Sequence, residues 1–168
     1  MASYLELRDV SVVFSGFRAV NKVNLKIEKG ELRVLIGPNG AGKTTIMDMI
    51  TGKTRPTEGQ ILLDGYDITG KPPYKIAETY RIGRKFQGPN IFANMTVFEN
   101  IEVALRGYSS LIKTFTYRRT PQIVEKINGI LKQINLYDYR DMVSSSLSHG
   151  QRQWLEMGMV LAQDPKVI

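Results

Sequence analysis

Residues 37–45 read Gly-Pro-Asn-Gly-Ala-Gly-Lys-Thr-Thr and match the pattern G-x-x-x-x-G-K-[ST] at every fixed position. The flanks are those that this pattern needs, because residues 31–36 predict a strand entering the glycines and residues 43–51 predict a helix leaving them. The glycines allow a tight turn in which successive backbone N–H groups point inward, at the positive end of the helix dipole. The stretch therefore predicts an α/β fold of the P-loop type, with a loop that binds phosphates.

The same loop carries the side chains that a nucleoside triphosphate requires. Lys43 can reach the β and γ phosphates as a point charge, and the Thr44 hydroxyl can bind Mg²⁺ beside them. We therefore expect ATP and Mg²⁺ as cofactors, with Lys43 as a catalytic residue. The candidate nucleotide-binding residues of the loop are Gly37, Asn39, Gly40, Ala41, Gly42, Lys43, Thr44 and Thr45.

Composition excludes several other kinds of site. The 168 residues include no cysteine and only His149 as a histidine, so disulfides, thiolate metal sites and histidine clusters are excluded. No apolar run approaches the roughly 18 residues of a membrane span, and we expect a cytoplasmic protein.

The net charge is +7, and residues 71–119 hold nine basic and three acidic residues. This basic stretch contains no recognisable nucleic-acid motif, so no nucleic-acid partner is expected.

Apolar periodicity divides the chain into three parts. Alternation over the first thirty residues predicts antiparallel strands, and a short strand at residues 60–63 precedes an Asp64-Gly65 hairpin turn. Residues 81–86 resemble a core strand, and helical spacing begins beyond Thr96. We expect an ATP-binding core with an antiparallel β subdomain (residues 1–93), an inserted helical subdomain (94–147) and a helix returning to the core (148–168).

A second motif, Leu147-Ser148-His149-Gly150-Gln151, opens a segment with helical spacing that Asp164-Pro165 ends. Ser148 followed three residues later by Gln151 forms a capping box, in which the cap residue contributes about 0.5–2 kcal/mol. This local explanation requires no ligand.

Taken together, the phosphate loop, Phe86-Gln87 and the Ser148 motif resemble, in this order and spacing, the nucleotide-binding subunit of an ABC transporter. The resemblance implies that Phe14 stacks on the adenine. It implies that Gln87 is a catalytic residue that senses Mg²⁺ and the γ-phosphate and links them to the membrane subunit. It further implies that Ser148, His149, Gly150 and Gln151 contact ATP bound to the opposite subunit.

The resemblance also implies partners. We expect a second copy or a paralogous ABC subunit in a head-to-tail dimer, and permease subunits that hold the protein at the inner face of the cell membrane. Residues 84–87, 96–100 and 148–156 look most like the urea-uptake branch of the branched-chain amino acid importers. A branched-chain amino acid importer proper stays open, because its signature motif usually carries tyrosine in place of His149.

Two further classes are less consistent with the sequence. A soluble ABC protein acting on nucleic acid or ribosomes usually carries paired cassettes or long coiled-coil insertions, and neither is seen here. An unrelated P-loop kinase leaves the Ser148 motif unexplained.

The sequence ends before several residues that the resemblance implies. Residues 164–168 resemble the approach to a strand that, in the family, ends in a Mg²⁺-binding aspartate and a water-polarising glutamate. A later histidine that contacts the γ-phosphate is also missing. We therefore expect a C-terminally incomplete core that binds ATP without turning it over and that self-associates through exposed strand edges.

Overall fold

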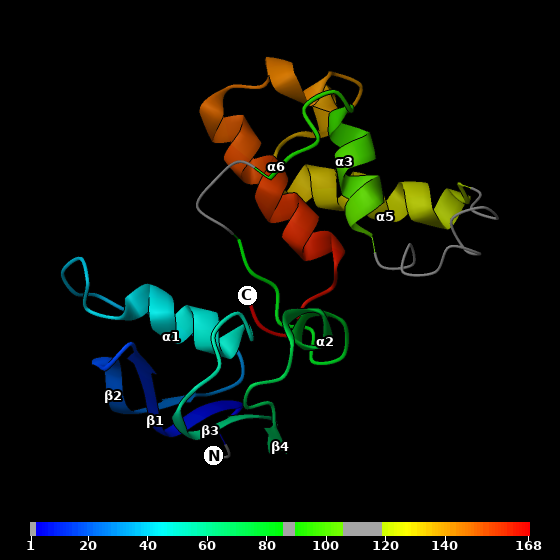
Figure 1. Ribbon diagram of the computed structural model, residues 1–168. Coiled ribbons are helices and arrows are strands. Elements are labelled where there is room, and N and C mark those ends of the chain that lie inside the picture. Colours follow the sequence, from blue (N-terminus) through cyan, green and yellow to red (C-terminus); the bar gives the residue numbers. More distant parts are fainter. Residues whose placement is uncertain (1–2, 86–89, 106–118) are drawn as a thin grey trace. The chain divides into compact units, whose positions relative to one another are not determined.

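The computed structural model describes residues 3–85, 90–105 and 119–168 (Figure 1). By their contacts, the residues form two compact units, one of residues 1–80 and one of residues 81–168. The predicted boundaries at residues 93 and 147 remain predictions.

The first unit contains a four-stranded antiparallel sheet in the order β2-β1-β3-β4. Its strands are β1 (Leu5–Phe14), β2 (Phe17–Ile27), β3 (Glu58–Leu63) and β4 (Tyr66–Asp67). Strands β3 and β4 meet at the Asp64-Gly65 turn, where both residues have positive φ (50° and 79°), as the favoured two-residue hairpin turn requires. This sheet confirms the predicted antiparallel subdomain.

Two helices complete the first unit, α1 (Lys43–Ile50) and α2 (Pro73–Glu78). Helix α1 contacts β2 and buries Met49 and Ile50. The predicted helix after the phosphate loop is therefore confirmed, whereas the sequence analysis did not predict α2.

The predicted strand at residues 31–36 is wrong. These residues have no regular secondary structure, and Leu32, Val34 and Ile36 are 90%, 66% and 92% exposed. No strand in the described part of the chain pairs with them. An alternating apolar pattern forms a strand only where neighbouring strands supply backbone partners and a packed layer covers the side chains.

The second unit is helical, with α3 (Val97–Ala104), α5 (Pro121–Gln133) and α6 (His149–Ala162), and with single 3-10 turns η1 (Tyr137–Tyr139) and η2 (Ser144–Ser146). Figure 1 shows α6 beside α3 and α5, and these helices confirm the helical spacing seen in the sequence. The core consists of Val97, Ile101, Ile127, Ile130, Leu131, Ile134, Leu136, Leu147, Leu155 and Ala162.

The predicted core strand at residues 81–86 is also wrong within the described residues. Only Ile82 makes a β contact, an isolated parallel bridge to Val167. One bridge fixes a single position, and a strand needs a run of such pairs.

Asn100 ties the start of α3 to two other segments of the second unit. The two N–H groups of its buried Nδ2 are shared among Phe92 O (3.1 Å), Thr96 O (2.9 Å) and Ser144 Oγ (2.8 Å), and its Oδ1 accepts from Phe92 N (2.8 Å). The nitrogen and the oxygen of the amide therefore both have hydrogen-bond partners, as a buried polar group requires. Among the described residues, no helix combines the length and the apolar character that crossing a membrane requires.

Candidate functional site

The phosphate loop is an exposed backbone turn that ends at the N-terminus of α1. Gly40 and Gly42 both have φ of 83°, a left-handed conformation that glycine adopts without a steric penalty. A Cβ on Gly42 would also lie 3.0 Å from Ala19 O and 3.2 Å from Val20 Cγ2 on β2. Gly42 is therefore required both for its conformation and for the close approach of the loop to the sheet.

No side chain caps α1. Gly42 is its N-cap residue, no side-chain hydrogen bond reaches its first turn, and no acidic residue lies there. The backbone N–H groups at a helix N-terminus and the helix dipole together attract anions. The local structure therefore suits phosphate oxygens.

Lys43 lies across the loop. Its Nζ donates to Gly37 O and to Pro38 O, each at 2.7 Å. A lysine ammonium has three donors, so one remains for a phosphate oxygen. The two carbonyl contacts hold this charge beside the turn formed by Asn39, Gly40 and Ala41, all of which are exposed.

The loop suits Mg²⁺ only together with a nucleotide. Thr44, exposed in the first turn of α1, supplies one hydroxyl, and Thr45 next to it is half-buried. The described residues contain no cluster of three acidic or histidine side chains that could hold a metal ion. This donor set fits a Mg²⁺ ion that takes most of its oxygen ligands from phosphates and water.

Phe14 and Phe17 lie at the tip of the β1–β2 hairpin. They are paired in register and are 47% and 71% exposed. The close approach of Gly42 to Ala19 and Val20 brings the phosphate loop next to this hairpin. An aromatic ring accessible to a base therefore lies in the same unit as the phosphate site, and the role predicted for Phe14 remains a prediction.

The Ser148 motif forms the start of α6, and the predicted capping box is present. Ser148 Oγ accepts from Gln151 N (3.3 Å), and Ser148 N donates to Gln151 Oε1 (2.9 Å). His149 Nε2 lies 2.9 Å from Gln153 Nε2 on the next turn. As an acceptor, the serine hydroxyl keeps its own O–H donor for a further partner.

Gly150 is not needed for packing. A Cβ built on it would meet no atom within 4 Å, and the residue is exposed. The glycine therefore leaves space at the surface of the motif, which suits the approach of another molecule.

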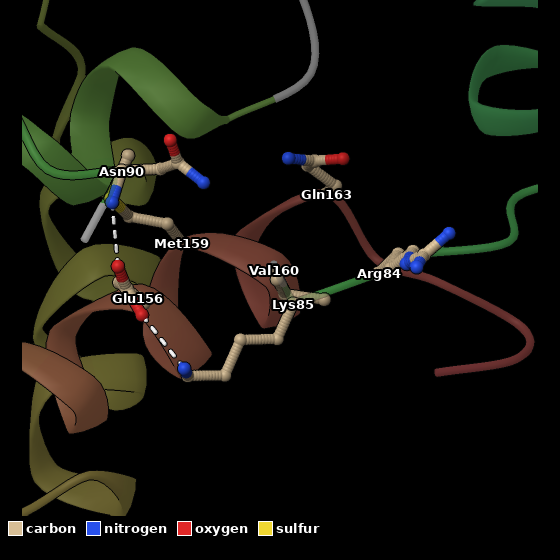
Figure 2. Close-up of a pocket in the computed structure, with 7 residues that line it drawn as sticks. All are labelled: Arg84, Lys85, Asn90, Glu156, Met159, Val160 and Gln163. Atoms are coloured by element: carbon tan, nitrogen blue, oxygen red, sulfur yellow. Dashed lines mark hydrogen bonds and ion pairs between the residues drawn. The ribbon is translucent and has the colours of Figure 1, made fainter. Parts of the chain in front are cut away.

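Gln87 lies outside the described residues. The residues on either side of that gap, Lys85 and Asn90, both bind Glu156 on α6, with Lys85 Nζ 2.9 Å from Oε2 and Asn90 N 2.6 Å from Oε1 (Figure 2). They line a cavity of about 550 Å³ together with Arg84, Met159, Val160 and Gln163.

Glu156 was not among the residues expected from the sequence. The sequence does contain one indication of its burial. Glu156 lies four residues before the apolar Val160, and residues four apart share one face of a helix, which here is the buried face of α6.

Comparison with known proteins places these features in one family. The family model described as "ABC transporter" matches residues 20–168. A probable branched-chain amino acid transport ATP-binding protein of Archaeoglobus fulgidus is 38% identical over 170 residues, which cover 98% of this chain and 65% of that protein. A sulfate/thiosulfate import ATP-binding protein of Pseudomonas syringae is 36% identical over 165 residues, covering 98% of this chain and 48% of that protein.

A solved structure agrees with these sequence matches. The ADP conformation of an ATP-binding cassette of an ABC transporter superposes with a TM-score of 0.83 at 33% identity, covering 98% of this chain and 66% of that one. The chain spans at most about two thirds of the length of these three proteins. Because the family match includes the phosphate loop, the Ser148 motif and most of the chain between and around them, the chain belongs to the ABC transporter family.

Proposed function

We propose that this protein is the ATP-binding subunit of an ABC importer and that it binds ATP with Mg²⁺ through residues 37–45. The observation that carries the proposal is the geometry of the loop, in which the uncapped N-terminus of α1 and the Lys43 ammonium lie at the same turn. Both groups attract phosphate oxygens.

In this proposal each predicted residue has one task. The loop N–H groups and Lys43 bind the β and γ phosphates, the Thr44 hydroxyl contributes one ligand to Mg²⁺, and Phe14 stacks on the base. Gln87 completes the Mg²⁺ and γ-phosphate contacts. We also propose that the whole protein hydrolyses ATP to drive uptake; the chain spans 65% of the length of the Archaeoglobus relative.

The Ser148 motif serves a second subunit. Its hydroxyl donor and the exposed surface at Gly150 would contact the γ-phosphate of ATP held by a second copy or a paralogous subunit, arranged head to tail. A permease at the inner face of the membrane would bind beside the cavity of Figure 2, next to the position of Gln87 in the chain.

For the cargo we propose urea, with a branched-chain amino acid as the alternative. Support for urea comes from the resemblance of residues 84–87, 96–100 and 148–156, including His149. Support for an amino acid comes from the name of the Archaeoglobus relative. The sulfate relative is 36% identical, so overall identity at this level does not distinguish cargoes.

Titration with a fluorescent ATP analogue and Mg²⁺ tests the nucleotide site. Lys43→Ala should weaken binding at least about tenfold, because a hydrogen bond to a charged group contributes about 1.5–3 kcal/mol. Lys53→Ala is the matched control, since Lys53 is an exposed lysine just beyond α1 that pairs with Asp48. Equal affinities of wild type and Lys43→Ala would reject the assignment.

The cargo needs a separate test. Uptake of labelled urea and labelled leucine would be compared in cells that carry the intact importer, with wild-type or Lys43→Ala subunits. Uptake of leucine but not urea, abolished by Lys43→Ala, would reject urea and retain the importer.

A further inference from the structure

The tip of the β1–β2 hairpin, which carries Phe14 and Phe17, lies at the end of an irregular backbone ladder. The register of β1 against β2 shifts three times between Leu7 and Val13. On the other side of β1, the pairing with β3 ends at Ser11, three positions before Phe14. The position of the tip therefore depends on contacts beyond the last backbone pair with β3.

Thr57, the residue just before β3, supplies such a contact. Its backbone N–H donates to Ser11 O at 2.8 Å, and its hydroxyl oxygen accepts from the backbone N–H of Val13 at 3.1 Å. The hydroxyl takes the place that a strand carbonyl has in an antiparallel ladder. Thr57 thus extends the pairing of β1 to the residue that directly precedes Phe14.

The chain around Thr57 connects it to the phosphate loop. Pro56, which precedes it, is buried, and its ring fixes the backbone φ. The β-branched side chain of Thr57 has few rotamers. Further back, the N–H of Thr54 donates to the carbonyl oxygen of Asp48 on α1 at 3.0 Å. The segment that leaves α1 is therefore bonded to that helix at one point and to the hairpin at another.

The hairpin consequently has one contact of this kind on each strand. On β2, Ala19 and Val20 lie against Gly42 at the start of α1, and on β1, Thr57 binds Val13. The base and the phosphates of a nucleotide are joined covalently, so a stacking ring must lie at a fixed distance from the phosphate loop. Contacts on both strands restrain the hairpin, whereas the contact at Gly42 alone would leave it free to tilt.

We propose that Thr57 is a positioning residue for base binding, whose hydroxyl holds the end of β1 so that Phe14 meets the base of a nucleotide bound at residues 37–45. The inference rests on the proposed function, because it concerns the stacking role proposed for Phe14. Thr57 touches neither the base nor the phosphates in this proposal. Its loss should therefore weaken binding of ATP and leave binding of a triphosphate without a base unchanged.

The test measures binding of ATP and of inorganic tripolyphosphate, each with Mg²⁺, to the intact protein. Thr57→Val keeps the shape of the side chain and removes the hydroxyl, whereas Thr57→Ser keeps the hydroxyl. We expect the dissociation constant for ATP to rise about threefold to tenfold in Thr57→Val, the size of effect that one hydrogen bond gives. It should stay within about twofold of wild type in Thr57→Ser. The dissociation constant for tripolyphosphate should stay within about twofold of wild type in both variants.

Thr69→Val is the matched control. The Thr69 hydroxyl oxygen accepts from the backbone N–H of Ile61 on β3 at 2.8 Å. The substitution therefore removes the same kind of contact from the same sheet, but away from the hairpin tip. It should lower the melting temperature and leave both dissociation constants near those of wild type.

A double-mutant cycle tests whether Thr57 acts through Phe14. In a Phe14→Ala background, Thr57→Val should change the affinity for ATP by less than about twofold, because the ring that it positions is gone. The same loss as in the wild-type background would show that Thr57 acts by another route and would overturn the inference.

Wild-type affinity for ATP in Thr57→Val would also overturn it. So would an equal loss in Thr69→Val, or a parallel loss of affinity for tripolyphosphate, since either would indicate a general loosening of the unit. If Phe14→Ala itself binds ATP as tightly as wild type does, the stacking role in the proposed function fails, and the inference fails with it.

Discussion

At the scale of single residues, the glycines of the two motifs serve different purposes. Gly42 needs its left-handed φ of 83° and has no room for a Cβ. Gly150 has open space around the position of a Cβ. The first glycine is thus required by the fold of the loop, and the second leaves a surface open to another molecule.

Substituting these two glycines should therefore separate stability from function. Gly42→Ala should lower the free energy of unfolding by about 1–3 kcal/mol, the usual cost of a strained backbone conformation, and should weaken binding of the ATP analogue. Gly150→Ala should leave the free energy of unfolding unchanged or raise it, because alanine is the better helix former. Chemical denaturation checks both values, and an equal loss in the two variants would contradict this account.

The base-binding role that we propose for Phe14 gives a second prediction at this scale. A ring offers a stacking face without hydrogen-bonding groups, so Phe14→Ala should weaken ATP and GTP alike. Stacking of a base on an aromatic side chain is worth about 1–3 kcal/mol in nucleic-acid systems. Titration of both nucleotides measures this. A larger effect of Phe17→Ala, the more exposed ring of the hairpin, would transfer the role to Phe17.

At the scale of the elements, Glu6 links β1 to β2 by charge. Its Oε2 accepts from Arg8 Nη2 at 2.7 Å, and its Oε1 lies 3.3 Å from Nζ of Lys26, its register partner on β2. Arg8 first, and then Lys26, lower the pKa of the Glu6 carboxyl from 4.5 to about 2.

This pKa predicts how the first unit responds to acid. The folded state keeps Glu6 ionised at pH values where the unfolded chain binds a proton, so its stabilising contribution is complete above about pH 4.5 and is lost as the pH falls to about 2. Glu6→Gln should reduce the decline of the free energy of unfolding over this interval, and Arg8→Gln should do the same. Denaturation series between these pH values measure the slope. An unchanged slope in Glu6→Gln would refute the ion-pair explanation.

The packing of α6 gives the other prediction at this scale. A Cβ on Gly158 would lie 2.6 Å from Ile134 Cδ1 and 2.9 Å from Ile101 Cδ1, whereas a Cβ on Gly129 of α5 would meet nothing within 4 Å. Gly158→Ala should destabilise the second unit by about 1–3 kcal/mol through overpacking. Gly129→Ala should stabilise it by about 0.5–1 kcal/mol, because only the helix propensity changes. Thermal unfolding of both variants measures these changes in stability. Stabilisation by both substitutions would contradict the prediction, because it would show that the side chains around Gly158 can move to make room for a Cβ.

At the scale of the whole molecule, the residues of the loop and the hairpin that we propose to bind the nucleotide belong to one unit. Residues 1–80 contain Phe14 and the complete phosphate loop, whereas residues 81–168 contain the Ser148 motif and Glu156. ATP bound by a single chain should therefore stabilise mainly the first unit.

Thermal unfolding with and without ATP and Mg²⁺ tests this division. At 100 times its dissociation constant, the nucleotide should stabilise the binding unit by about 2.7 kcal/mol and raise its melting temperature. Where two transitions are resolved, only that of the first unit should move. A shift in the second transition alone would place the nucleotide elsewhere.

The sequence by itself determined the features that depend on neighbouring residues. The phosphate loop, the hairpin turn at Asp64-Gly65, the capping box at Ser148 and the long helices all follow from contacts within a few positions. Glycine conformations, helix caps and apolar periodicity are local properties, so the pattern and the structure agree there.

Only the tertiary structure determined the features that depend on residues far away in the sequence, namely strand pairing and the contacts of buried charges. Residues 31–36 and 81–86 have strand-like patterns, yet a strand forms only where another strand supplies its hydrogen bonds, and the pattern does not carry that information. From the sequence, Glu156 is an ordinary polar residue of a helix. In the structure, its carboxylate accepts a hydrogen bond from the backbone N–H of Asn90, sixty-six positions away. The physical reason is the same in both cases, because pairing and burial are properties of the packed chain and not of any short segment.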